Sequence, residues 1–234
     1  FLNKINNNDK NKVVNPFHNY PFGIEPLADR ETYLRIWNNA KNKQYPTIDN
    51  MEKTCGFSIQ KEWLDKLALH TQVVIKESEI CYQHGRLLYS KLSEYCANKN
   101  LKSINILEIG TARGFSALCM ASAMEERNIK GKIFTIDPLP HNIPMYWNCI
   151  DDIEGEKSRR QLLDEYSELI KKYILFLEGK SKDILNKLKI SRINFAFIDG
   201  IHEYEDVKFE IGYVAPQQQN GDIILFDDFN ETLF

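Results

Sequence analysis

The chain has 234 residues, of which 43% are hydrophobic, and this suits one large α/β domain with an appendage. The formal net charge is −3 and no long basic run occurs, so we expect no nucleic-acid partner. No apolar run reaches the roughly 18 residues of a membrane span, so we expect no membrane partner. The five cysteines form no C-x-x-C pair, which predicts reduced thiols and a cytoplasmic location.

The first 57 residues predict an irregular N-terminal arm. Residues 1–12 are rich in Asn and Lys, and prolines recur through the segment that follows. One short helix is expected around residues 31–38. Residues 58–103 then predict a helical extension, which packs on the remainder of the chain because its apolar stripes need a partner surface.

Two helices are expected in this extension. The first begins at Ser58, a candidate N-cap, and places Ile59, Trp63 and Leu67 on one face. The second is expected over residues 78–98. Pairing of the same helices between two chains, which would give a homodimer, stays open.

From residue 104 onward, apolar segments alternate with amphipathic ones. The expected strands span residues 104–109, 132–136, 174–177, 193–198 and 222–226, and the expected helices lie near residues 115–128, 158–172, 181–188 and 204–214. This alternation predicts a Rossmann-like, doubly wound α/β fold, whose mostly parallel sheet is covered on both faces. Ligands of such sheets bind at the carboxyl ends of the strands.

A glycine-containing turn follows the first of these strands. Glu108, Gly110 and Gly114 span the strand end and the start of the next helix. Glycine allows backbone N–H groups to approach a ligand closely. Asp137 ends the second strand and is placed to accept hydrogen bonds from the hydroxyls of a ribose. Together these features predict an adenosine-bearing cofactor.

The glycine spacing favours one cofactor over another. A dinucleotide fold requires G-x-G-x-x-G, and this pattern is absent. Glu108 would repel a pyrophosphate but would suit a cationic ligand, such as the ammonium group of S-adenosylmethionine. Taken alone, the two glycines are equally consistent with a plain turn between strand and helix.

Three aspartates end the last two strands. Asp199 follows the fourth strand, and Asp227 and Asp228 follow the fifth. Converging carboxylates repel one another, and a hard divalent cation such as Mg²⁺ relieves this repulsion. The alternative is that Asp227 or Asp228 caps a turn while Asp199 binds a backbone amide.

His202, three residues after Asp199, is the candidate proton acceptor. An imidazole at this strand end can accept a proton near neutral pH, although a lone histidine is more often a cap or a surface residue. His84 is interpreted as a packing residue of a helix. The proline- and aromatic-rich loop 138–152 either covers the cofactor or the acceptor, or is a packed surface loop.

Together these segments resemble the class I S-adenosylmethionine-dependent methyltransferases, in particular the metal-dependent O-methyltransferases of the catechol type. Residues 108–117 are similar to that family's first motif, and residues 178–184 to the motif beside the adenine. Residues 197–204 and 220–228 resemble the segments that supply the metal ligands. The resemblance covers residues 104–234, the expected methyltransferase domain. The family's final hairpin is missing, so we expect this domain to be incomplete at its C-terminus.

The resemblance implies roles for individual residues. The implied cofactor-binding residues are Glu108, Gly110, Thr111, Ala112, Gly114, Ser116, Asp137, Gly179, Ser181 and Asp199. The implied metal ligands are Asp199, Asp227 and Asp228, and the implied catalytic residues are His202 and Asp199. His202 stands where the catechol type has lysine, and Asp228 where it has asparagine.

Three aspartates are more similar to the bacterial sugar and macrolide O-methyltransferases. The resemblance therefore implies a Mg²⁺-dependent O-methyltransferase that acts on a hydroxyl of a small molecule, namely a sugar, a polyol or a catechol-like compound. A metal-independent methyltransferase of the same fold, using His202 alone, is the first alternative. A non-catalytic partner subunit with the methyltransferase fold is the second.

Overall fold

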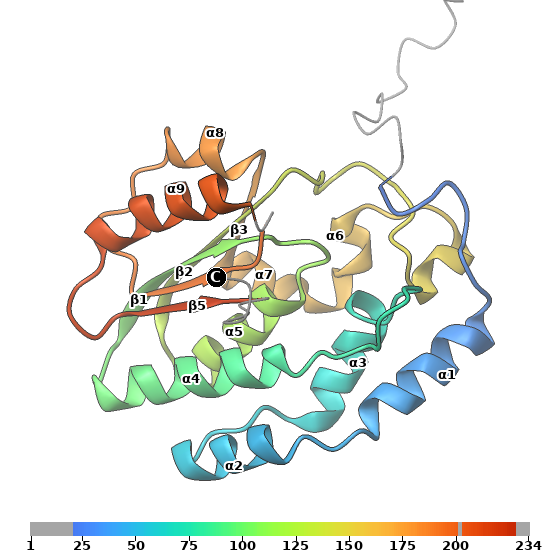
Figure 1. Ribbon diagram of the computed structural model, residues 1–234, viewed down its shortest axis with the longest axis horizontal. Coiled ribbons are helices and arrows are strands. Elements are labelled where there is room, and N and C mark those ends of the chain that lie inside the picture. The colour runs from blue at the N-terminus through green and yellow to red at the C-terminus, as the bar shows by residue number, and fades with distance from the viewer. Residues whose placement is uncertain (1–20, 201–202, 228–234) are drawn as a thin grey trace, which may run out of the picture.

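The computed structural model describes residues 21–200 and 203–227. In these residues five strands form one sheet: β1 (Ser103–Ile109), β2 (Lys130–Asp137), β3 (Ile174–Glu178), β4 (Phe195–Ile198) and β5 (Ile223–Phe226). The strand order is β3-β2-β1-β4-β5 and each neighbouring pair is parallel (Figure 1). The predicted doubly wound sheet is confirmed, and every expected strand boundary lies within two residues of the observed one.

Helices cover both faces of this sheet. One face packs against α4 (His84–Asn98), α5 (Phe115–Glu126) and α7 (Ser167–Tyr173), and the other packs against α8 (Ser181–Leu185) and α9 (Tyr204–Val214) (Figure 1). The strands supply both cores, because successive side chains point to opposite faces. In β1, for example, Ile106 belongs to the first core and Leu107 to the second.

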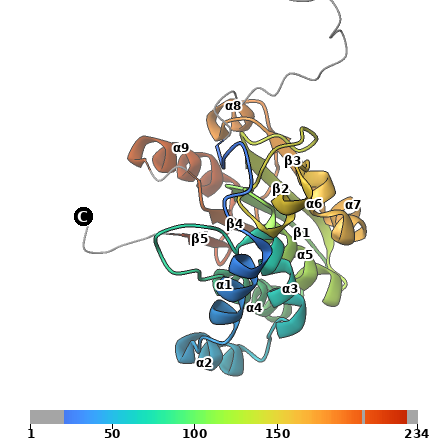
Figure 2. The same ribbon diagram turned by 90° about the vertical axis from the view of Figure 1, so that its right-hand side faces the viewer.

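The N-terminal helical extension is present, but it begins before the expected residue 58. Its outer helices, which lie outside α4 and α5, are α1 (Arg30–Lys41), α2 (Pro46–Cys55) and α3 (Lys61–Thr71). Helix α2 packs on α4, and α3 packs on α5, so these helices form a layer beyond the sheet domain (Figure 2). Their buried side chains join the larger core. The exact domain boundaries stay a prediction.

One part of the expected irregular arm is helical. Helix α1 corresponds to the single helix expected there, whereas α2 was not expected. Pro46 occupies the first turn of α2, where a missing N–H costs no hydrogen bond. Gly56 ends the helix in the left-handed conformation, with φ of 78°. Residues 1–20, the remainder of the expected arm, lie outside the described residues.

Other expected helices also differ from the observed ones. The helix expected to begin at Ser58 is α3, which begins at Lys61 with Gln60 at the N-cap position, so Ser58 does not cap it. The helix expected near residues 181–188 ends at Leu185. The helix expected over residues 78–98 begins only at His84. The helix expected over residues 158–172 divides into α6 (Arg159–Leu162), a 3₁₀ turn (Asp164–Tyr166) and α7. Within the part of the chain that the structure describes, no helix is both long and apolar enough to cross a membrane.

Candidate active site

The loop after β1 is held against the ends of two other strands. The amide of Gly110 donates to the carbonyl of Ile136 at 2.9 Å, and the amide of Asp199 donates to the carbonyl of Ile109 at 2.8 Å. Gly110 has φ of 97°, and a Cβ built on it would lie 1.9 Å from the carbonyl oxygen of Asp199. Only glycine fits here, because both the backbone conformation and the approach of the neighbouring strand exclude a side chain.

The same loop leads directly into α5. Gly114 adopts φ of 92° immediately before the helix, and its amide donates to the carbonyl of Thr111 at 2.7 Å. A Cβ on Gly114 would approach Leu163 to 2.8 Å. Ala112 also has a positive φ, 44°, and its amide donates to Asp137 Oδ2 at 2.8 Å. The turn predicted between strand and helix is therefore present.

Asp137 is a buried carboxylate at the end of β2. Its Oδ2 accepts from Ala112, and its Oδ1 accepts from the amide of Leu139 at 2.7 Å. Burial raises the pKa of Asp137, while these two amides and the nearby Arg159 oppose the rise. The carboxylate thus ties the glycine loop to the start of the segment after β2, at the edge where a ribose is expected.

Glu108 lies beneath the loop and is fully buried. The hydroxyl of Thr135 donates a hydrogen bond to Glu108 Oε2. The hydroxyls of Thr135 and Thr111 are also hydrogen-bonded to each other. Burial raises the pKa of Glu108 to about 7, and the hydroxyls of Ser116 and Thr135 oppose this rise. A cationic group bound nearby would favour the ionised form, because opposite charges attract strongly where water is excluded.

A cavity of about 520 Å³ opens beside the glycine loop. From the sheet domain it is lined by residues that the sequence assigns to the cofactor or the metal: Gly110, Thr111, Ala112, Ser116, Asp199 and Asp227. From the helical extension and the start of α4 it is lined by Ile48, Gln72, Lys76, Cys81, Gln83, His84 and Leu87. The cavity thus lies between the strand ends and the extension.

The other assigned cofactor residues lie around this cavity without lining it. Glu108, Gly114 and Asp137 belong to the base of the loop. Gly179 follows β3, and its amide donates to the carbonyl of Asp137 at 2.9 Å. Ser181 is the first residue of α8. These positions form a continuous path from the cavity to the end of β3.

The two described aspartates of the expected metal site share the cavity. Ile198 pairs with Phe226, so Asp199 and Asp227 follow adjacent positions in neighbouring strands. The amide of Asp227 donates to the carbonyl of Ile198 at 3.1 Å. Both aspartates line the cavity, and carboxylate oxygens are the ligands that Mg²⁺ prefers.

The remaining expected ligand and the expected base are not described. Asp228 and His202 both lie outside residues 21–200 and 203–227. Within those ranges no group of three or more His, Cys, Asp or Glu side chains could hold a metal ion. The three-aspartate site and the role of His202 therefore stay predictions.

His84 has a second role besides the expected packing role. Its ring packs edge-on against Phe115, with centroids 4.9 Å apart, and it also lines the cavity. Burial lowers the pKa of His84, whereas the charge of Asp227 opposes this shift and Lys76 adds to it. No sequence motif marks His84, because only the packing of α4 on the sheet brings it to the strand ends.

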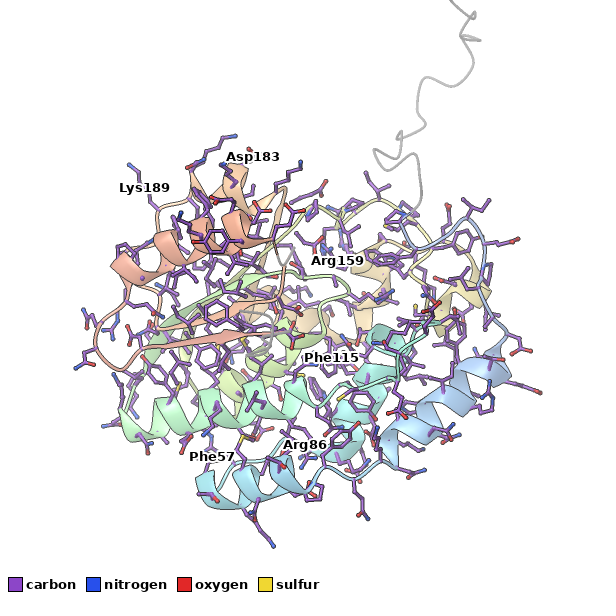
Figure 3. All side chains as sticks on the ribbon, in the orientation of Figure 1. Phe57, Arg86, Phe115, Arg159, Asp183 and Lys189 are labelled. Atoms are coloured by element: carbon purple, nitrogen blue, oxygen red, sulfur yellow. The ribbon has the colours of Figure 1, made fainter. Side chains whose placement is uncertain are left out.

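Arg159 was not among the expected site residues. It is the first residue of α6, and its side chain is 2% exposed. Its Nε donates to the carbonyl of Ala112 at 2.8 Å, so it reaches the glycine loop from a segment 47 residues away (Figure 3). Such a contact leaves no trace in local sequence periodicity.

The loop over residues 138–152 is a packed segment. Met145, Trp147 and Cys149 are fully buried, and Met145 forms an antiparallel bridge with Lys157. Arg113 of the glycine loop donates to the carbonyl of Trp147, with Nε at 2.6 Å. The segment is therefore packed and anchors the glycine loop, and a role in covering the cofactor or acceptor stays a prediction.

The chain is similar to one described protein family and to several solved structures. Residues 107–229 match a family model described as a methyltransferase domain. No curated protein matches the chain. The O-methyltransferase NovP shares 15% identity over 86% of this chain and 85% of its own, with a TM-score of 0.51. The SAH-bound methyltransferase PaMTH1 of Podospora anserina shares 21% identity over 79% of this chain and 70% of its own, with a TM-score of 0.49.

Proposed function

This chain belongs to the methyltransferase-domain family and is a class I, S-adenosylmethionine-dependent enzyme, and we propose that it methylates a hydroxyl oxygen of a small molecule. One observation carries the proposal. Four residues of the glycine loop line the same cavity as Asp199 and Asp227, namely Gly110, Thr111, Ala112 and Ser116. A cofactor held by the loop would therefore present its methyl group to an acceptor held near the two aspartates.

The cofactor would extend along the carboxyl ends of the strands. The backbone of the glycine loop would bind its methionine part, close to the buried Glu108. Asp137 would accept hydrogen bonds from the ribose, and Gly179 and Ser181 would border the adenine. The amide of Gly179 donates to the carbonyl of Asp137 at 2.9 Å, so the expected ribose and adenine sites are adjacent.

We assign a Mg²⁺ site to Asp199, Asp227 and Asp228. When bound, the ion would lower the pKa of an acceptor hydroxyl and orient it. The register of β4 and β5 supports this assignment, because Asp199 and Asp227 each follow one residue of the pair Ile198 and Phe226 in neighbouring strands. Cβ-free Gly110 lets the strand end that carries Asp199 approach the cofactor loop.

His202 would remove the proton of the acceptor hydroxyl, with Asp199 beside it. The sulfonium methyl group is already activated, so the main tasks of the protein are alignment and deprotonation. Holding the acceptor oxygen in line with the methyl group and sulfur can contribute several kcal/mol through proximity, roughly 7–11 in well-oriented systems.

The acceptor would lie against the helical extension. This wall is mixed in character: Gln72, Lys76 and Gln83 are polar, and Ile48 and Leu87 are apolar. A hydroxylated small molecule such as a sugar, a polyol or a catechol-like compound suits a wall of this kind. We propose no nucleic-acid or membrane partner.

Methyl transfer to defined acceptors tests this proposal. The full chain would be incubated with methyl-labelled S-adenosylmethionine, Mg²⁺ and a panel of sugars, polyols and catechols. Label recovered as a methyl ether is the expected result. Label recovered only on nitrogen or carbon would contradict O-methylation, and S-adenosylmethionine binding without turnover on any acceptor would favour a non-catalytic partner subunit.

A further inference from the structure

A buried arginine approaches the expected ribose site from outside the recognised motifs. Ser158 caps α6, since its hydroxyl accepts from the amide of Gln161 at 3.2 Å, and this fixes where Arg159 starts. Arg159 Nε then donates to the carbonyl of Ala112 at 2.8 Å. Its Nη2 lies 3.7 Å from Asp137 Oδ1, an ion pair that is too long for a hydrogen bond.

One end of this side chain has no hydrogen-bond partner. Among the described residues, Arg159 Nη2 is buried and makes no hydrogen bond. A buried donor without an acceptor costs free energy, and the cost is larger for a charged group. An unused donor beside Asp137 is therefore consistent with a partner that the protein chain does not itself supply.

The guanidinium is held in place by aromatic rings and carboxylates. It lies over the rings of Trp147 and Phe176, with centroid distances of 5.5 and 5.6 Å. Burial lowers the pKa of Arg159, while Asp137, Glu178 and Glu108 oppose this shift. The side chain thus has little freedom to turn away, and its free donor keeps facing the carboxylate at the end of β2.

A second unpartnered polar atom lies on the same side. His141 Nδ1 is buried without a hydrogen-bond partner among the described residues. The His141 ring stacks on Phe176, with centroids 4.1 Å apart, so Phe176 contacts both His141 and Arg159. Arg159 Nη2 beside Asp137 and His141 Nδ1 are thus two unused polar atoms on residues that share Phe176 as a neighbour, which is consistent with a polar ligand here.

We propose that Arg159 is a further cofactor-binding residue, whose Nη2 donates to a ribose hydroxyl oxygen while Asp137 accepts from the ribose hydroxyls. A vicinal diol matches this pair, because each hydroxyl both donates and accepts. The inference rests on the proposed cofactor site. Arg159 would supply a hydrogen-bond donor to the ribose oxygens, whereas the motifs supply only the acceptor, Asp137.

A purely structural role for Arg159 makes a different prediction. In that case the side chain would only hold the glycine loop through Ala112, and its loss would weaken every cofactor analogue by the same factor. Direct contact with the ribose instead couples the effect of the mutation to the presence of a hydroxyl. Comparing deoxy analogues on two proteins separates the two roles.

The experiment is calorimetry of S-adenosylhomocysteine and of its 2′-deoxy and 3′-deoxy analogues. The proteins are the wild type, Arg159→Gln, and the matched control Arg160→Gln, which changes the exposed neighbouring arginine of the same helix. Arg159→Lys keeps the charge but lacks the second nitrogen, and it decides the question should Arg159→Gln not fold. Circular dichroism establishes the folding of each variant.

We expect Arg159→Gln to weaken S-adenosylhomocysteine binding by about 10- to 100-fold, as for a lost hydrogen bond to a charged group. The deoxy analogue that lacks the hydroxyl bound by Arg159 should bind more weakly than S-adenosylhomocysteine to the wild type and to Arg160→Gln. Its affinity should not fall further in the Arg159 variants. An equal loss for all three ligands would overturn this inference alone. A wild-type protein that binds none of them would overturn the proposed function as well.

Discussion

The carbonyl oxygen of Asp199 lies 1.9 Å from the position that a Cβ on Gly110 would occupy. This contact joins the two halves of the proposed site, because Gly110 belongs to the cofactor loop and Asp199 ends the strand beside it. The hydrogen bond from Asp199 to the carbonyl of Ile109, at 2.8 Å, holds the same pair of strands together. The loop and the aspartate therefore cannot move independently.

Substituting Gly110 should disrupt both the fold and the site. Gly110→Ala forces a Cβ into a carbonyl oxygen and strains a positive φ, so we expect a loss of more than about 3 kcal/mol in the free energy of unfolding. The matched control is Gly212→Ala in α9, where nothing lies within 4 Å of the added Cβ. Replacing an exposed helical glycine should stabilise by up to about 1 kcal/mol. Urea denaturation measures both, and equal effects would contradict the packing argument.

The buried Glu108 should make stability depend on pH. Its folded pKa of about 7 lies above the ordinary value of 4.5, so between these values the folded protein retains a proton that the unfolded chain releases. The contribution of Glu108 to the free energy of unfolding is therefore fully present below about pH 4.5, and it is lost as the pH rises from about 4.5 to 7.

Glu108→Gln removes this dependence. Relative to wild type, the variant should gain on the order of 3 kcal/mol in unfolding free energy between pH 4 and pH 8. Glu62→Gln, at an exposed position on α3, is the control and should show no such trend. Denaturation curves at several pH values measure the difference. A gain in unfolding free energy that is independent of pH would show that burial does not shift the pKa of Glu108.

The proposed metal site predicts dependence on a divalent cation. Chelator treatment should abolish methyl transfer, and Mg²⁺ should restore it. Asp227→Asn should raise the Mg²⁺ concentration needed for half-maximal rate by about 10-fold or more, since it removes a charged oxygen ligand. Asp164→Asn, an exposed aspartate elsewhere, should behave as wild type. Full activity in the presence of a chelator would instead support the metal-independent alternative.

His202 is predicted to be the general base. His202→Ala should lower kcat by about 10²- to 10⁴-fold and leave S-adenosylhomocysteine affinity nearly unchanged. His70→Gln is the control, because His70 bonds to Asp151 at 2.6 Å and does not line the cavity. Steady-state rates across neutral pH measure the effect. A His202→Ala enzyme with the wild-type rate would instead assign the role of base to Asp199 or to a metal-bound hydroxide.

The sheet and one side of the site could be predicted because they depend on local signals. Continuous apolar runs marked the buried parallel strands, and the glycine turn marked the loop after β1. The meeting of Asp199 and Asp227 followed from a general rule, since the carboxyl ends of parallel strands share one edge. Helix α2 also carries local signals, because Pro46 lies in its first turn and Gly56 ends it in the left-handed conformation.

The opposite side of the site depends on tertiary packing. Arg159 reaches Ala112 across 47 residues, and His84 reaches the cavity only because α4 packs beside the strand ends. Neither belongs to a motif, and the spacing of apolar residues does not indicate where a helix end will lie. The break after Leu162 was equally hidden, because the apolar stripe continues through it.

Calorimetric titration of the full chain with S-adenosylmethionine and with NAD tests the central claim most directly. Both ligands carry adenosine, so a general adenosine site would not distinguish them, whereas a glycine turn beside Glu108 favours the cation over the pyrophosphate. The account predicts saturable 1:1 binding of S-adenosylmethionine and much weaker or undetectable binding of NAD. Tighter binding of NAD would contradict the assignment of this site.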